Sequence, residues 1–262
     1  MTNKINNKSG GNKSSGVTTI GGNILSASVL AYCGYKIINN RLIKSKYEPN
    51  PNKKSKYYMY NIKETLIFGF HGCDETLCDE LVCGKKVSLS YSENAYDWLG
   101  KGMYFWENDP ERALEWAKNL IKHKQNKNQN IMNPAVLGAV ICLGHCLDFL
   151  EKKNLDLLKK HYFSVKEQFA SNNIALPQNS GGKDLYKREL DCFLINSLVV
   201  KQREDDPENA YDSVRGVFFE GQELYPNAGF REKDHIQIAI INPNCIKAFF
   251  KLRKEDKKFH SV

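Results

Sequence analysis

Residues 100–117 read GKGMYFWENDPERALEWA, and this stretch carries the clearest local structural signals of the chain. A glycine-rich turn leads into the apolar residues 103–106, which predicts a strand. Asn108 or Asp109 can then cap a helix that has Pro110 in its first turn. Alanine, leucine and isoleucine recur on one face of that helix. We therefore expect a glycine turn, a strand and a capped helix in immediate succession.

Apolar runs on both sides of this stretch predict further elements. The expected strands are residues 64–71, 135–143, 216–220, 236–241 and 246–252. The expected helices are residues 74–82, 147–169 and 184–199, and the charged residues 203–212 are expected to be exposed. Helices lie mostly in the middle of the domain and strands at both ends, which predicts an α+β fold with antiparallel pairing.

The chain has 262 residues, enough to bury a core without disulfides or metals. Its 41% hydrophobic and 26% charged residues exclude the disordered, collagen-like and polytopic membrane classes for the bulk of the chain. Composition shifts along the sequence predict four segments. These are a disordered basic tail (1–16), an apolar or helical extension with a linker (17–56), a folded domain (57–254) and a frayed tail (255–262).

The net charge of +8 is unevenly placed. Residues 1–57 hold ten basic residues and one acidic residue, so the remainder is nearly neutral. A neutral body argues against a large nucleic-acid face, whereas the basic extension could contact an anionic surface. Residues 14–35 lack charge and are long enough to cross a bilayer, but polar residues and glycines dilute them. We expect a cytoplasmic protein, with secretion or membrane association through residues 14–35 left open.

Eight cysteines in a chain of this length do not form a disulfide framework, and they favour a reducing compartment. Cys73, Cys78 and Cys83 recur every five residues, whereas zinc sites use more closely paired cysteines. We therefore expect no metal. The sequence also contains no P-loop, no dinucleotide-binding glycine motif and no serine-hydrolase elbow.

Three short sequences occur in a fixed order: FGFHG, which ends at Gly72, GKGMYF at residues 100–105, and IQIAI at residues 236–240. Together they resemble the ADP-ribosyltransferases of the diphtheria-toxin and poly(ADP-ribose) polymerase type, over about residues 67–251. That family has a His-Gly pair on its first strand and a G-[KR]-G-hydrophobic-Tyr-Phe strand that leads into a helix. Its third signature residue begins a C-terminal strand. Residues 135–200 are more similar to bacterial proteins that share GxGIYFWE, an LDC helix and a REKxHIQI strand.

The resemblance implies split antiparallel sheets around a cleft for NAD, with flanking helices. It implies that the His71 imidazole bonds the adenosine ribose and that the Gly72 backbone holds the nicotinamide amide. The ring of Tyr104 would lie on one face of the nicotinamide and Trp116 on the other. The further NAD-binding residues that we expect are Gly102, Phe105 and Arg231.

The third signature position departs from the family, because its usual glutamate aligns with Gln237. Alternation with the neighbouring isoleucines places Gln237 on the opposite face of its strand from them. Glutamine can accept a hydrogen bond from a ribose hydroxyl but supplies no charge, and in the family this change disfavours chain elongation. We expect Gln237 to act in catalysis, with Glu232 or Glu220 able to supply the missing carboxylate.

These implications predict a mono-ADP-ribosyltransferase that uses NAD as substrate, needs no metal and releases nicotinamide. Its acceptor is a macromolecule, a protein rather than a nucleic acid. Three alternatives remain open: an NAD glycohydrolase, a non-catalytic module that binds NAD or a partner, and an RNA 2′-phosphate transferase, which the neutral domain disfavours. His71, Tyr104 and Trp116 could each also be ordinary packing residues.

Overall fold

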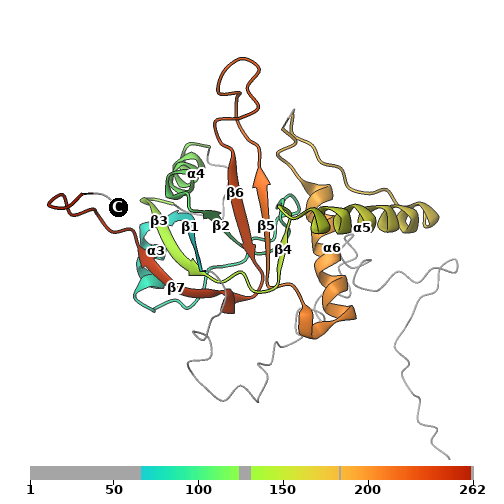
Figure 1. Cartoon of the computed structure of the whole chain (residues 1–262), viewed down its shortest axis with the longest axis horizontal. Coiled ribbons are helices and arrows are strands. Elements are labelled where there is room, and N and C mark those ends of the chain that lie inside the picture. Colours follow the sequence, from blue (N-terminus) through green and yellow to red (C-terminus); the bar gives the residue numbers. More distant parts are fainter. Residues whose placement is uncertain (1–65, 124–130, 183, 261–262) are drawn as a thin grey trace, which may run out of the picture.

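The computed structural model describes residues 66–123, 131–182 and 184–260. The expected basic tail, the extension with its linker, and the domain start at residue 57 lie outside these ranges. Within them the protein is a mixed α/β structure, with one seven-stranded sheet and helices at both ends of it (Figure 1). Across the described ranges, no helix combines the length and the apolar composition needed to span a bilayer.

The strands follow the sheet order β4-β5-β6-β2-β1-β3-β7. Their bounds are β1 Ile67–Asp74, β2 Met103–Glu107, β3 Pro134–Ile141, β4 Cys146–Asp148, β5 Ser213–Phe218, β6 His235–Ile240 and β7 Ile246–Lys251. All neighbours pair antiparallel except β4 and β5, which pair parallel. The expectation of antiparallel pairing throughout is thus wrong at one edge. The reason is that two helices separate β4 from β5, and a long crossover connection can return a strand in parallel.

The sheet has a narrow seam between β1 and β2. Within the described residues these strands pair only at Gly69 with Glu107 and at Phe70 with Trp106, whereas β1 pairs with β3 at eight positions. One part of the sheet is therefore β7-β3-β1 and the other is β2-β6-β5-β4. The resemblance implied two separate sheets. In the structure these two parts form one continuous sheet, joined by hydrogen bonds at this seam.

The described chain has four α-helices: α3 (Glu75–Val82), α4 (Pro110–His123), α5 (Lys152–Ser171) and α6 (Glu189–Asp205). Leu81 of α3 packs with Phe105 and Leu137 on one face. On the opposite face, α4 covers β1 and β3, and α6 packs on Val214 and Ala239 of β5 and β6. We call this second face the α4/α6 face. Helix α5 packs against α6, farther from the sheet (Figure 1).

Gly72 allows α4 to approach β1 closely. A Cβ atom at Gly72 would lie 2.1 Å from the carbonyl oxygen of Ala113 and 3.2 Å from the Cβ of Ala117. The first of these distances is far below van der Waals contact, so no larger residue fits here without moving the helix. Asp109 begins α4 as predicted, because its Oδ1 accepts a hydrogen bond from the Arg112 amide at 2.9 Å.

Two predicted helices have different bounds in the structure. The predicted helix 147–169 begins only at Lys152, because residues 146–148 pair with β5. The predicted helix 184–199 instead spans Glu189–Asp205, so part of the charged segment 203–212 is helical. Later in that segment Tyr211 is buried rather than exposed. Both differences come from contacts between residues distant in sequence.

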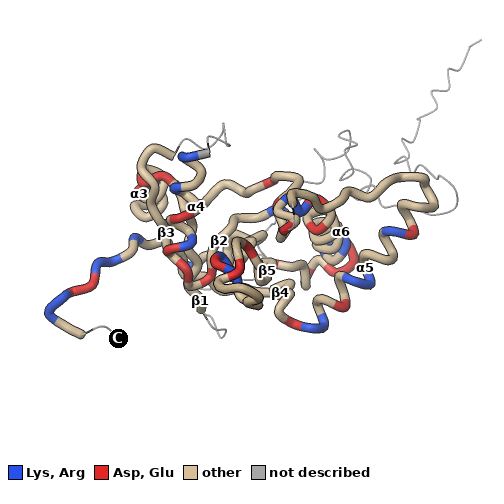
Figure 2. Tube along the Cα trace, turned by 90° about the horizontal axis from the view of Figure 1, so that it is seen from above, with Lys and Arg blue, Asp and Glu red and all other residues tan. Residues whose placement is uncertain are grey.

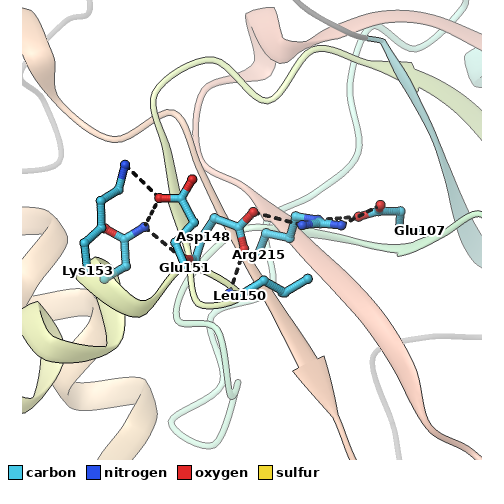
Figure 3. Close-up of polar contacts among 7 residues, drawn as sticks. Glu107, Asp148, Leu150, Glu151, Lys153 and Arg215 are labelled. Carbon is cyan, nitrogen blue, oxygen red and sulfur yellow. Dashed lines mark hydrogen bonds and ion pairs between the residues drawn. The ribbon is translucent and has the colours of Figure 1, made fainter.

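An ion-pair network holds together three strands on the face opposite α4 and α6 (Figure 3). Arg215 of β5 donates to both carboxylate oxygens of Glu107 on β2, at 2.5 and 2.8 Å. Its remaining nitrogen donates to Asp148 of β4 at 2.8 Å. The bidentate geometry and partial burial make this pair far stronger than an exposed one. Elsewhere both signs of charge alternate along α5 and the C-terminal segment (Figure 2).

Candidate functional site

The candidate site lies on the α4/α6 face, on the strands between the places where α4 and α6 pack. Trp106 of β2 pairs with Gln237 of β6, which in turn pairs with Gly216 of β5. Residues directly opposite in antiparallel strands share a face, so these positions form one row across three strands. His235 lies on the same face, two residues before Gln237.

His71 lies at the seam, and because it pairs with Leu137 its side chain leaves β1 on the face opposite α4 and reaches Trp116 across the seam. Its Nδ1–H donates to the Tyr104 carbonyl oxygen at 2.8 Å, across the gap where β1 and β2 no longer pair. The ring contacts Phe105, with centroids 5.9 Å apart, and Trp116 of α4, at 6.3 Å. Burial lowers the pKa of His71 below its ordinary value, although the Tyr104 carbonyl opposes that shift. The ring is therefore neutral at pH 7, with Nε2 as a hydrogen-bond acceptor.

The backbone of Gly72 points toward the same seam. The Phe68 carbonyl accepts a hydrogen bond from the Asn108 amide at 3.0 Å, on the β2 side of β1. Because backbone groups alternate in direction along a strand, those of Phe70 and Gly72 point the same way. Pairing with β2 ends at Phe70. The N–H and carbonyl of Gly72 thus face a position beyond the last paired residue, where a ligand amide could bond both.

The ring of Tyr104 is fixed from its hydroxyl end. The hydroxyl donates to the Gly100 carbonyl at 2.7 Å and accepts from the Leu99 amide at 3.0 Å. The same turn is held to α6 by Asn196, whose Oδ1 accepts from the Lys101 amide at 2.8 Å. The glycine-rich turn is therefore rigidly placed at both ends. Gly102, the last residue of that turn, fits closely against Ala239 of β6.

Aromatic rings form a chain of contacts across the α4/α6 face. Trp116 contacts Trp106 at 5.6 Å between centroids, and Trp106 contacts His235 at 6.2 Å. His235 contacts Phe218 at 5.6 Å, and Phe218 contacts Trp98 at 3.8 Å. Trp116 thus lies beside His71 and Trp106. Phe105, by contrast, is fully buried in the core on the opposite face.

Gln237 is buried and already bonded. Its Oε1 accepts from the indole N–H of Trp98 at 2.6 Å, and the residue is only 8% exposed. It lies on the opposite face from Ile236, Ile238 and Ile240, as the alternation predicted. Because an indole nitrogen can only donate, the amide must turn its oxygen toward Trp98 and its NH₂ group away. Gln237 therefore presents a donor, rather than an acceptor, to the rest of the site.

The other expected polar residues lie near the turn between β5 and β6. Glu220 pairs with Arg112 of α4 at 2.7 Å, so this carboxylate is already neutralised beside the site. Glu232 is exposed in the loop, and its carboxylate accepts only a long 3.4 Å hydrogen bond from the Gln222 amide. Arg231 pairs with Asp184. The structure thus brings Glu220 near His235 and leaves Glu232 at the surface.

Sequence reasoning missed Trp98, Trp106, His235, Asn196 and Arg112. A period-two signal could have found two of them, since Trp106 follows Tyr104, and His235 precedes Gln237, by two residues each. Trp98 belongs to the site because it bonds Gln237, which is 139 residues away in the sequence. No local sequence pattern predicts such a contact.

Within the three described ranges, no group of three or more His, Cys, Asp or Glu side chains lies close enough to hold a metal ion. Comparison with protein-family models, with curated proteins and with solved structures gives no significant match. The chemistry of the site therefore follows from its own residues. It offers a backbone donor and acceptor at Gly72, a neutral imidazole at His71 and flat aromatic surfaces beside both.

Proposed function

We propose that this protein is an NAD-dependent mono-ADP-ribosyltransferase, which transfers one ADP-ribose to a macromolecular acceptor, most simply a protein. One observation carries the proposal. The backbone N–H and carbonyl of Gly72 point into the seam beyond Phe70, next to the His71 imidazole. A carboxamide such as that of nicotinamide has one acceptor and two donor hydrogens, which such a pair of backbone groups can satisfy.

The residues around the seam fit the remaining parts of NAD. Nε2 of His71 can accept a hydrogen bond from a ribose hydroxyl, because Nδ1–H is committed to the Tyr104 carbonyl. Trp116 and Tyr104 supply flat apolar surface for the nicotinamide ring. These contacts fix the orientation of the bond between nicotinamide and ribose, and positioning is a major contribution that an enzyme makes to a dissociative cleavage.

The proposed reaction breaks the bond between the nicotinamide nitrogen and C1′ of the ribose. Nicotinamide leaves with the electron pair, C1′ forms a new bond to the acceptor nucleophile, and the nucleophile loses a proton. Gln237 adds no negative charge near the ribose, so it stabilises the cationic transition state less than a carboxylate would. A single slow transfer, rather than polymer formation, follows from this.

The test is nicotinamide release from NAD, with and without cell lysate as a source of acceptor. His71→Ala should lower the rate at least tenfold, because it removes an acceptor and its ring contacts. His260→Ala is the matched control, since this exposed histidine lies outside the sheet and helices. The proposal is wrong if wild-type protein releases no nicotinamide under either condition, or if the two variants behave alike.

A second candidate function is favoured by one specific contact. The bond from Trp98 to Gln237 turns the donor side of the amide toward the site, where the related transferases use an acceptor. A module that binds NAD without cleaving it would show that property. Saturable binding of NAD by calorimetry, together with no nicotinamide release in lysate, would support this second function over the first.

A further inference from the structure

Five buried side-chain atoms of the described residues lack a hydrogen-bond partner: besides Nε of Arg188 and Oδ1 of Asp234, there are three in and around His235 on the α4/α6 face. These three are Nε1 of Trp106, Nε2 of His235 and Nε of Arg112. The three residues are 4%, 8% and 9% exposed, so these atoms are withdrawn from solvent. Buried polar atoms in native proteins are nearly always hydrogen-bonded, so unpartnered atoms on three neighbouring residues point to a ligand that supplies the missing partners.

The hydrogen-bond roles of the three atoms can be assigned. Nδ1–H of His235 donates to the Lys233 carbonyl at 2.5 Å, which leaves Nε2 as an acceptor in the neutral ring. The pKa of His235 is lowered overall, mainly by burial and also by the charge of Arg112. The Lys233 carbonyl, Glu220 and Asp109 oppose this shift. Trp106 and Arg112 can only donate.

Two donors and one acceptor match a hydroxyl group, which accepts through its oxygen and donates its single hydrogen. The site therefore fits an alcohol better than a carboxylate, which would leave His235 without a donor. It lies beside Gln237, because His235 and Gln237 are neighbours on one face of β6, about 7 Å apart along the strand. This inference rests on the proposed function, under which the ribose next to the nicotinamide would place its hydroxyls at these three residues.

We propose that His235, Trp106 and Arg112 form a hydroxyl-binding site for that ribose, with Nε2 of His235 accepting the hydroxyl hydrogen. His235 thereby provides the acceptor that Gln237, turned toward Trp98, does not present. Arg112 is held in place by Glu115 at 3.1 Å and by Glu220 at 2.7 Å.

The direct test uses the three tryptophan indole N–H signals in a proton–nitrogen correlation spectrum of the full chain, assigned with Trp→Phe variants. Addition of ADP-ribose, which carries ribose hydroxyls, should shift the Trp106 signal strongly. Nicotinamide alone, which has no hydroxyl, should leave it nearly unchanged. A response of Trp98 and Trp116 without Trp106 would overturn the hydroxyl site and leave the proposed function standing.

A matched variant set gives the second test. His235→Phe keeps the ring contacts and removes the acceptor, so KM for NAD should rise about tenfold, one lost hydrogen bond. His235→Gln restores an acceptor and should recover most of that loss, whereas His145→Gln, at a distant exposed histidine, should have no effect. Equal KM values for His235→Phe and wild type would overturn the inference. If wild type neither binds ADP-ribose nor releases nicotinamide, the proposed function fails and this inference fails with it.

Discussion

The indole N–H of Trp98 donates to Oε1 of Gln237 at 2.6 Å, although 139 residues separate the two. This bond joins the loop before β2 to the strand that carries the third signature position. It also decides which side of the amide faces the rest of the candidate site. A carboxylate at the same place could bond the indole through one oxygen and present the other to a ribose hydroxyl.

Under the proposed function, Gln237→Glu should therefore raise the rate of nicotinamide release, by on the order of tenfold to a hundredfold, because a negative charge would stabilise an oxocarbenium-like transition state. The measurement is steady-state nicotinamide release at fixed NAD. Gln222→Glu, which adds the same charge in the exposed loop, is the control and should change the rate by less than about twofold. A fall in rate for Gln237→Glu at unchanged stability would contradict this reading of Gln237.

Gly72→Ala should destabilise the domain by about 1–3 kcal/mol, because the new methyl group would meet the Ala113 carbonyl at 2.1 Å. Urea unfolding followed by circular dichroism gives the free energy of unfolding. Gly229→Ala is the matched control, since a Cβ there meets nothing within 4 Å. If the two variants have the same midpoint, α4 does not pack against β1 as described.

Arg215→Met should cost about 3–5 kcal/mol of unfolding free energy, because Glu107 and Asp148 would keep buried charges without their partner. Lys152→Met removes an exposed pair with Asp156 and should cost less than about 1 kcal/mol. The double variant Arg215→Met/Glu107→Gln should recover part of the loss. Similar midpoints for Arg215→Met and Lys152→Met would show that the network is only a surface feature.

The free energy of unfolding should fall as the pH drops below 6.5. Burial lowers the pKa of His161 to about 4. Between this value and pH 6.5 the histidine is therefore protonated in the unfolded chain but neutral in the folded one. This one residue should cost about 2 kcal/mol at pH 5 relative to pH 8. His161→Gln, which can still donate to the Ser197 hydroxyl, should remove that share of the loss. An equal pH dependence in wild type and variant would exclude His161 as the cause.

Local signals were enough to predict the strand and helix at residues 103–123, because turn, apolar run and helix cap follow one another directly. They failed at α6, which begins at Glu189. Its first amides are bonded by Oδ1 of Asn179, at 2.9 Å for Leu190 and 3.2 Å for Asp191, from a loop ten residues earlier. A distant cap of this kind has no sequence signature. The expectation of a mixed helix and strand domain was confirmed.

Some residues of the candidate site could likewise be predicted from local motifs, and others could not. The motifs identified His71, Gly72 and Tyr104 as residues of interest, and the structure brings them together at the seam. His235 and Arg112 stand out only because each has a buried nitrogen without a hydrogen-bond partner. This burial arises only when β2, β6 and α4 pack together. Arg112 also looks like an ordinary charged residue on an amphipathic helix. Packing, rather than residue type, distinguishes it.

The narrow seam between β1 and β2 has a consequence for how the domain holds together. Within the described residues the polypeptide crosses this seam four times, and the last crossing places β7 beside β3. Neither part of the sheet is a continuous piece of chain, so no single cleavage separates one part from the other. Although only two residue pairs join β1 and β2, the two parts are interlaced by connectivity and should melt as one cooperative unit.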